Sequence, residues 1–343
     1  MYFSYNPWGN IDWIIDKLTH IEKWNFLGVV STEERSLGAW MWLKDKGKLN
    51  NFEMWKIKDV DNPPSPFKEF TEKEYLKNEK NYFRNGGQKL LEFALLESDG
   101  NASEFFNLFI KKTEGDLILD ISAMPKRWFF PIIRNCIENP KIKNLLVTYT
   151  IAKFYSKKQG EESQAWKYFP SFGELPEREK IEKIYIISAG YQPLSLPEWI
   201  SQYESSKKYI LFPFPASITG YTRIWDFIRK LEADCFNYNN NFKIIYVSGF
   251  NLPLIYSTIK NIIELEKDKE PIFIPYGPKP VSLAFAIISS MKHFPVGYTQ
   301  PWYYNPYYSI GFEETHKKAP KTMTYLLKEN GNLLYLPPEI TYS

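Results

Sequence analysis

The sequence contains few of the residues from which metal centres and nucleophilic active sites are most often built. Its three histidines, His20, His293 and His316, lie far apart and form neither an HxH nor an HExxH pattern. Its two cysteines, Cys136 and Cys235, have no CxxC partner, and both fall in stretches with a helical pattern. These spacings argue against a metal site, and we expect buried thiols in a reducing compartment.

Sequence motifs for nucleotide binding and for serine hydrolysis are also missing. The chain has no GxGxxG, no GxxxxGK[ST] and no GxSxG. We therefore expect neither a standard dinucleotide site, nor a P-loop, nor a nucleophile elbow, and we predict no cofactor.

The balance of charge and the length of the apolar runs give no support to two further classes, polyanion-binding proteins and membrane-spanning proteins. The 43 basic and 40 acidic residues give a net charge of +3, which is too balanced to predict a polyanion-binding surface and leaves nucleic acid open as a partner. The longest apolar helical run, Val281 to Met291, is shorter than the roughly 20 residues that span a bilayer. Met1 to Asn10 is aromatic and polar, unlike a secretory leader. We expect a cytoplasmic protein without a membrane partner.

The sequence does contain many short apolar runs that alternate with helical patterns. This alternation predicts an α/β fold with mainly parallel sheets, because parallel strands need crossover helices. The polar stretch from Ser156 to Gln164 is the best candidate boundary. We predict two Rossmann-like halves, residues 1–160 with an N-terminal helix and residues 161–343 with an aromatic C-terminal extension.

Local patterns predict three smaller features. Lys89 to Leu96 is expected to form a helical turn or two, and Asn251-Leu252-Pro253 to start a helix over Leu254 to Leu265. We also predict a hairpin about Asn330-Gly331-Asn332.

The two predicted halves share a weak internal repeat. Pro125-Lys126 and Pro278-Lys279 each follow an apolar strand and begin an apolar helix, and Tyr149-Thr150 and Tyr298-Thr299 follow those helices. The strands ending at Val30 and Phe212 correspond in this alignment, as do those beginning at Phe52 and Lys243. We interpret the repeat as a possible internal duplication.

Polar residues at the predicted strand ends are the candidates for function, because ligands of parallel sheets lie beyond the carboxyl ends of the strands. We select Asp120 and Glu34 as candidate catalytic residues, and no metal ligand. The candidate ligand-binding residues are Arg35, Ser122, Lys126, Thr150, Ser248, Asn251, Lys279 and Thr299. A lysine at a helix N-terminus suits phosphate or another anion. The structural alternatives are a helix-capping Asp120, a surface pair of Glu34 and Arg35, and solvated lysines.

Aromatic residues crowd the stretch from Trp302 to Tyr308. These rings could stack nucleobases or dock a protein partner. Because Pro301 and Pro306 interrupt the run, the alternative is a packed loop that covers the second half.

Two Rossmann-like halves, each with a strand, a short polar loop and a lysine at a helix start, resemble the CARF-type sensors of prokaryotic defence. Those sensors recognise cyclic oligonucleotides between two such units. The resemblance rests on Asp120 to Lys126 and on Pro275 to Lys279. It implies that Lys126 and Lys279 contact phosphate. The chain departs from the pattern in lacking an effector domain and a Gly-Thr-rich loop.

These observations predict a protein that binds a nucleotide or another phosphorylated ligand at the strand ends, with antiviral defence as the role implied by the resemblance. One alternative is a nucleotide-processing hydrolase or transferase that uses Asp120 or Glu34. The other is an interaction subunit that docks a protein through Trp302 to Tyr308. The sequence does not decide whether a reaction is catalysed.

Overall fold

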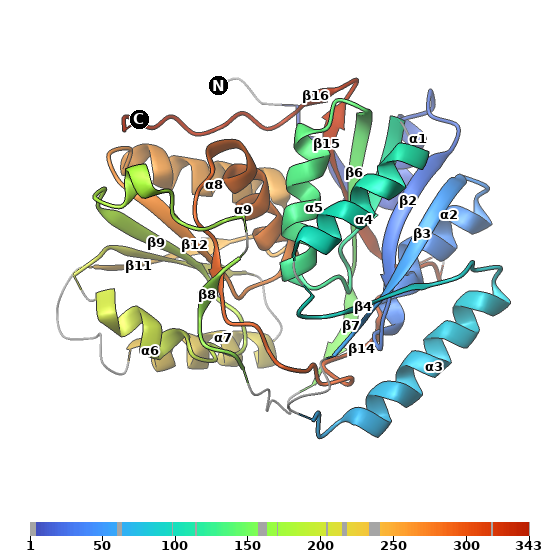
Figure 1. The fold of residues 1–343 in the computed structure, drawn as a ribbon, viewed down its shortest axis with the longest axis horizontal. Helices are drawn as coiled ribbons and strands as arrows, with labels where there is room; N and C mark the ends of the chain where they lie inside the picture. Colours follow the sequence, from blue (N-terminus) through green and yellow to red (C-terminus); the bar gives the residue numbers. More distant parts are fainter. Residues whose placement is uncertain are drawn as a thin grey trace. The chain divides into compact units, whose positions relative to one another are not determined.

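The chain forms two compact units in a computed structural model that describes residues 5–59, 64–97, 99–113, 115–156, 163–169, 171–203, 205–214, 218–232, 241–316 and 318–342. Unit 1 comprises residues 1–161 and 302–335, and unit 2 comprises residues 162–301 and 336–343. The sequence-based division assigned residues 302–335 to the second half, whereas the structure places them in unit 1. The predicted α/β class with mainly parallel sheets is confirmed (Figure 1).

The sheet of unit 1 has a parallel centre. Its strands, in spatial order, are β1 (Trp8–Asn10), β15 (Thr322–Glu329), β6 (Ile142–Thr150), β5 (Gly115–Asp120), β2 (Trp24–Val30), β3 (Leu49–Lys58) and β4 (Leu91–Ala94). The strands from β6 to β4 are parallel, β15 is antiparallel to β6, and β16 (Asn332–Leu333) pairs with β15. The order of the strands along the chain reverses between β2 and β5.

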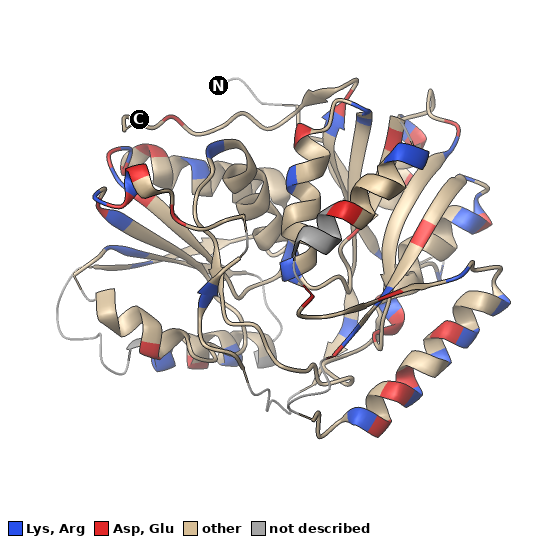
Figure 2. Cartoon of the chain, viewed as in Figure 1, with Lys and Arg blue, Asp and Glu red and all other residues tan. Residues whose placement is uncertain are grey.

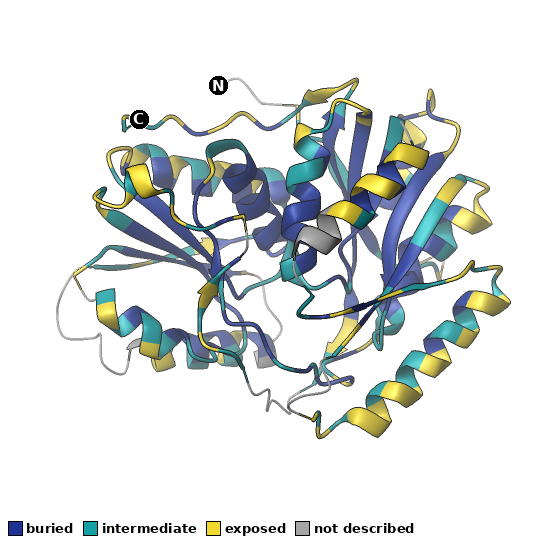
Figure 3. Ribbon diagram, in the orientation of Figure 1, coloured by how far each residue is buried: buried dark blue, intermediate teal, exposed yellow. Residues whose placement is uncertain are grey.

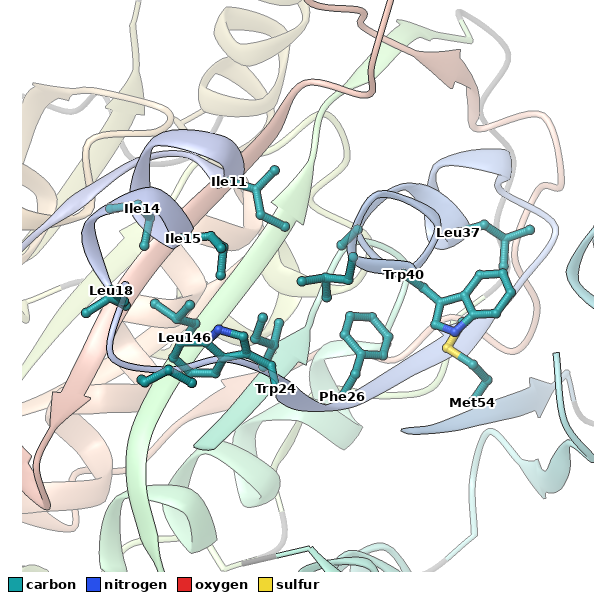
Figure 4. Packing of buried hydrophobic residues seen from close by; sticks show 14 of the residues in the cluster. Ile11, Ile14, Ile15, Leu18, Trp24, Phe26, Leu37, Trp40, Met54 and Leu146 are labelled. Carbon is teal, nitrogen blue, oxygen red and sulfur yellow. The ribbon is translucent and has the colours of Figure 1, made fainter. Parts of the chain in front are cut away.

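Helices cover both faces of this sheet, as parallel connections require. They are α1 (Ile11–Lys17), α2 (Gly38–Asp45), α3 (Lys68–Arg84), α4 (Asp99–Lys112) and α5 (Lys126–Glu138), with a 3-10 turn, η1 (Glu34–Leu37), before α2. Neighbouring strand residues face opposite sides: Met54 packs in one buried cluster with Trp24 and Trp40 (Figure 4), whereas Trp55 contacts Trp128 of α5.

The helix α3 has a strongly charged exposed surface. Acidic and basic side chains alternate along it (Figure 2), and most of its residues are exposed or half-buried (Figure 3). Asn78 and Tyr82 are its buried residues among those described. The Asn78 side-chain amide donates to the backbone oxygens of Ser31 and Thr32, which fixes α3 beside the end of β2.

The main sheet of unit 2 is wholly parallel. Its spatial order is β11 (Phe242–Val247), β10 (Lys208–Pro213), β9 (Lys183–Ser188) and β12 (Glu270–Pro275), and Val296 adds a parallel bridge to Phe273. The helices are α6 (Leu196–Ile200), α7 (Ile218–Glu232), α8 (Leu252–Leu265) and α9 (Lys279–Lys292), with short 3-10 turns η2 (Pro176–Arg178) and η3 (Ser201–Tyr203). Two small antiparallel pairs join β13 (Gly297–Tyr298) to β8 (Lys167–Tyr168), and, in unit 1, β14 (Ser309–Phe312) to β7 (Ala152–Tyr155).

The two sheets share one strand order. The order reverses between β9 and β12 in unit 2, as it does between β2 and β5 in unit 1. This order equates the segment β5-α5 with β12-α9, as the sequence alignment does. It equates β2 with β9, however, so the alignment of Val30 with Phe212 and of Phe52 with Lys243 is offset by one strand. Internal duplication stays a hypothesis.

Local predictions were right where a few neighbouring residues determine the outcome. The predicted hairpin forms, with Asn330 and Gly331 at φ of 51° and 83° between β15 and β16. The predicted helix after Asn251 begins at Leu252. The prediction of a helical turn over Lys89 to Leu96 is wrong, because the central residues of this stretch, Leu91–Ala94, form β4 at the edge of the sheet.

Candidate functional site at the carboxyl edges of the sheets

The point where strand order reverses is where parallel sheets bind ligands, because the loops that follow the two central strands run in opposite directions and leave a crevice. In unit 1 this point lies beyond the ends of β2 and β5, and in unit 2 beyond the ends of β9 and β12. Of the predicted residues, six lie in unit 1, namely Glu34, Arg35, Asp120, Ser122, Lys126 and Thr150. Four lie in unit 2, namely Ser248, Asn251, Lys279 and Thr299.

Arg35 forms a buried, neutralised ion pair at the ends of β2 and β6. Its guanidinium donates to one oxygen of Glu33 over 2.7 and 2.9 Å, and to the Thr150 carbonyl oxygen over 3.3 Å. The Ser309 hydroxyl donates to the same Glu33 oxygen, and the guanidinium carbon lies 5.4 Å from the centre of the Tyr149 ring. Burial is the largest single influence on Arg35 and lowers its pKa, but the charge and hydrogen bond of Glu33, together with the electrostatic effects of Tyr149 and Tyr155, outweigh burial and keep this pKa above its usual value.

Asp120 fastens the loop after β5 to β6. Its carboxylate accepts hydrogen bonds from the Ser122 backbone nitrogen (3.0 Å), the Ser122 hydroxyl (2.9 Å) and the Thr148 hydroxyl (2.7 Å). The Ser122 hydroxyl also accepts from the backbone nitrogen of Thr150 over 2.7 Å. Asp120 has no exposed surface, so its role here is structural. The predicted helix-capping role is wrong, because the residue before α5 is Pro125 and no side chain forms a cap hydrogen bond there.

Glu34 and Lys126 occupy the first positions of helical segments at this edge. Glu34 begins η1 directly after Glu33, and its side chain is half-buried. Lys126 is also half-buried and begins α5, after Pro125 with φ of −57° and ψ of 145°. The 13 residues of α5 give its N-terminus a positive dipole end, to which the lysine adds a full charge.

Asp59 lies at the same edge, directly after β3, and the sequence analysis did not select it. Among the described residues, its carboxylate accepts one hydrogen bond, a long one of 3.4 Å from the backbone nitrogen of Tyr304. Burial raises the pKa of Asp59 from 3.8 to about 6, and the Tyr304 hydrogen bond offsets only part of this rise. An acidic residue that ends a predicted strand was the available sequence signal.

Aromatic and charged groups surround Asp59. The Tyr75 hydroxyl donates to the Ile57 carbonyl oxygen over 2.6 Å. Burial raises the pKa of Tyr75, and the negative charges of Asp59, Glu33 and Glu79 raise it further. Lys56 pairs with Glu79 and lies 5.1 Å from the centre of the Tyr75 ring. Glu33 and Glu79 thus each have a basic partner, whereas Asp59 has no ion pair within the described part of the chain.

The aromatic segment from Trp302 to Tyr308 packs on unit 1. The ring of Tyr303 lies edge-on to Phe67, with centroids 6.1 Å apart, and Tyr307 contacts Phe70 of α3 in the same way. Tyr308 packs edge-on against Tyr155 of β7. The expectation of a loop covering the second half is therefore corrected: these contacts are made with the first unit, because β14 pairs with β7 and holds the segment there.

The reversal point of unit 2 is filled by close backbone packing. A Cβ atom added to Gly277 would lie 2.0 Å from the Ser188 hydroxyl oxygen, and one added to Gly190 would lie 2.3 Å from the Tyr276 carbonyl oxygen. The loops after β9 and β12 thus lie directly against each other. Lys279 begins α9 after this contact and is half-buried.

The other predicted residues of unit 2 have local structural roles. The Ser248 hydroxyl accepts from the backbone nitrogens of Phe250 and Asn251, over 3.2 and 3.0 Å. The Asn251 side chain caps α8 by accepting from the Leu254 backbone nitrogen over 3.1 Å. Thr299 is buried, and its hydroxyl lies 2.9 Å from that of Ser195.

The described ranges carry neither a metal-ligand cluster nor a membrane-spanning helix. These ranges contain no group of three or more histidine, cysteine, aspartate or glutamate residues placed to hold a metal ion. They also contain no helix with both the length and the apolar character to cross a bilayer. Cys136 is a buried free thiol whose pKa is raised by burial, and Cys235 lies outside the described residues.

Comparisons with known proteins identify no family. No protein family and no curated protein matches the sequence. Among solved structures, a point mutant of RipA aligns over 76% of this chain and 69% of its own, with 9% identity and a TM-score of 0.22. RipA from Yersinia pestis aligns over 74% and 69%, with 10% identity and a TM-score of 0.19. Likenesses this low carry no argument about fold or function.

Proposed function

We propose that this protein binds a nucleotide or another phosphorylated small molecule at the carboxyl edge of the unit 1 sheet. The observation that carries the proposal is the position of Lys126. This lysine begins the 13-residue helix α5, which follows β5 after a loop of residues 121–125, and β5 is one of the two strands between which the strand order reverses. A helix N-terminus offers backbone N–H donors and a positive dipole end, and the ammonium group adds charge for a phosphate.

Unit 1 is preferred over unit 2 because of the contacts at the two reversal points. In unit 2 the loops that contain Gly190 and Gly277 pack so closely that a Cβ atom added to either glycine would overlap a neighbouring oxygen atom, that of the Tyr276 carbonyl or of the Ser188 hydroxyl. In unit 1 the charges at the reversal point are balanced, since Glu33 neutralises Arg35. The resemblance to CARF-type sensors supports including cyclic oligonucleotides among the ligands, and a defence role is part of this proposal. Asp120 is buried and accepts a hydrogen bond from Thr148, so it is not exposed to act on a ligand, and we propose binding without catalysis.

The test is a ligand screen with a matched pair of variants. Thermal shift and calorimetry would compare mononucleotides, nucleoside triphosphates, cyclic oligoadenylates and inorganic phosphate on the wild type, Lys126→Gln and Lys17→Gln. Lys17 is exposed at the last position of α1 and serves as the control. We expect Lys126→Gln to weaken binding of the best ligand about tenfold, the loss expected for one charge-assisted hydrogen bond.

Two results would overturn the proposal. One is a screen in which no ligand raises the midpoint of thermal unfolding. The other is equal affinity of the best ligand for Lys126→Gln and for Lys17→Gln, since a site that includes Lys126 must distinguish the two variants.

A further inference from the structure

We infer that unit 1 binds single-stranded nucleic acid at the amino edge of its sheet, on a surface separate from the ligand site proposed at the carboxyl edge. We name this surface the basic patch. It comprises five basic residues at the ends of α2 and α3, namely Lys44, Lys46, Lys48, Lys80 and Arg84. Lys48 directly precedes the first residue of β3, which places the patch at the edge where the parallel strands begin.

The two helices end in the same kind of turn, and the two turns meet. In each, a glycine with positive φ stands two positions past the last helical residue, Gly47 at 64° and Gly86 at 78°, and its backbone nitrogen bonds back to the last turn. A Cβ atom added to Gly86 would lie 2.6 Å from the Lys44 Nζ atom. The ammonium group of Lys44 therefore lies at the turn that ends α3, two positions after Arg84.

The charges of the basic patch have no counterions within the described part of the chain. None of its five members forms an ion pair there, whereas the neighbouring Lys77 pairs with Glu74. Lys48 is half-buried and the other four are exposed. Five positive charges and the one negative charge of Asp45 give this small surface a net charge of +4, which exceeds the +3 of the whole chain.

The helix dipole explains only part of this charge. It stabilises basic residues in the last turn of a helix, where Lys44 and Arg84 stand. Lys48 lies three positions past the end of α2, and Lys80 lies one turn before the end of α3, so the dipole does not account for them. Closely spaced cations without counterions repel one another and attract a polyanion, whose condensed counterions are released on binding.

Exposed apolar side chains beside these charges favour a single strand over a duplex. Leu76 and Phe83 are 54% and 48% exposed. They lie four residues before and three residues after Lys80, so the three side chains share one face of α3. A base of a single strand can stack on the Phe83 ring while its phosphates contact the neighbouring cations, whereas the bases of a duplex are already stacked on one another.

The experiment removes two charges from the basic patch and compares the loss with the removal of two charges elsewhere. Fluorescence anisotropy at several salt concentrations would measure the affinity of the full chain for labelled oligothymidylate and oligouridylate of about 20 nucleotides, which is longer than a typical site. The test variant is Lys48→Gln/Lys80→Gln. The control is Lys180→Gln/Lys267→Gln, which removes two exposed lysines of unit 2 and therefore the same net charge.

We expect the control to bind within about twofold of the wild type, and the test variant to bind about tenfold more weakly at low salt. The slope of log affinity against log salt should become shallower by about 1.4 in the test variant, because each phosphate contact with a single strand contributes about 0.7. Binding of either oligonucleotide in this way supports the inference.

A second pair of variants tests base stacking. Phe83→Ala removes the ring beside the charges, and Phe154→Ala removes a ring of β7 that is 61% exposed and serves as the control. We expect Phe83→Ala to weaken binding of the single strand about tenfold and to leave the salt slope unchanged, because a stacking ring neutralises no phosphate. The control should match the wild type.

Three results would overturn the inference. One is a wild-type chain that binds neither oligonucleotide saturably, including a chain that binds only anionic phospholipid vesicles. Another is an equal loss of affinity in the two lysine variants. The third is a duplex that binds as tightly as the single strand, with no effect of Phe83→Ala. None of these results bears on the proposed function, because Lys126 begins α5 after the carboxyl end of β5, at the opposite edge of the sheet.

Discussion

At the scale of single residues, Gly190 and Gly277 set how closely two loops of unit 2 approach. A Cβ atom added to Gly277 would lie 2.0 Å from the Ser188 hydroxyl oxygen and 2.8 Å from the Ala189 carbonyl oxygen. Contacts below 3 Å with backbone atoms cannot be relieved by a side-chain rotation. These positions need glycine for space.

We predict that Gly277→Ala lowers the free energy of unfolding by about 1–3 kcal/mol, the usual effect of overpacking a filled site. Gly249→Ala is the matched control, because a Cβ atom there meets nothing within 4 Å. Denaturant unfolding monitored by tryptophan fluorescence would measure both. If the two variants unfold at the same midpoint, the close contact at the reversal point of unit 2 is not present in solution.

Most polar residues at the strand ends form hydrogen bonds with other residues of their own unit rather than facing solvent. Ser122 and Thr148 each donate a hydrogen bond to Asp120, and the Thr150 hydroxyl lies 2.9 Å from the Thr322 hydroxyl. Asp59 differs from them in its single long hydrogen bond among the described residues.

At the scale of elements, a lysine of the distant strand β15 caps the C-terminal end of α5. The last turn of α5 contains no basic residue to satisfy its free carbonyl groups. The ammonium group of Lys328 in β15 donates to the carbonyl oxygens of Cys136, Ile137 and Asn139, over 3.3, 3.2 and 3.0 Å. Burial lowers the pKa of Lys328, so these three acceptors compensate a desolvated charge.

We predict that Lys328→Met destabilises unit 1 by about 1–3 kcal/mol, because it leaves buried carbonyl groups without a donor. Lys321→Met is the control: Lys321 precedes β15 and pairs with Glu313 at the surface, with both side chains about 40% exposed. An exposed pair contributes at most about 1 kcal/mol. Equal or greater stability of Lys328→Met, measured by denaturant unfolding, would contradict the capping role.

At the scale of the whole molecule, the chain leaves unit 1 near residue 161 and returns to it near residue 302. The returning segment is structural, because β15 pairs with both β1 and β6 and every residue from Thr322 to Lys328 is buried. Residues 336–343 then belong to unit 2, where the Tyr256 hydroxyl donates to the Leu336 carbonyl oxygen.

We therefore predict that residues 1–161 alone do not fold cooperatively, since their sheet lacks the strand that covers β6. Joining residues 302–335 to residue 161 through a flexible glycine-serine linker should restore a cooperative thermal transition, followed by circular dichroism. The same linker without residues 302–335 is the control. Cooperative unfolding of residues 1–161 by themselves would show that β15 is dispensable.

The sequence by itself determined the class of fold and several local features. Apolar runs specify the buried strands, such as β2, in which every residue is buried. The Asn330-Gly331 turn and the Asn251 cap depend on residues within a few positions of one another, so neighbouring side chains suffice to predict them.

Only the tertiary structure decided the contacts that join distant residues. Arg35 bonds to the Thr150 carbonyl 115 positions away, and Lys328 bonds to the Cys136 carbonyl 192 positions away. The stretch from Lys89 to Leu96 reads locally as helical, but pairing with β3 makes it a strand. Asp59 owes its raised pKa to burial in the folded unit. Burial and long-range pairing are properties of the packed chain, which local sequence patterns do not encode.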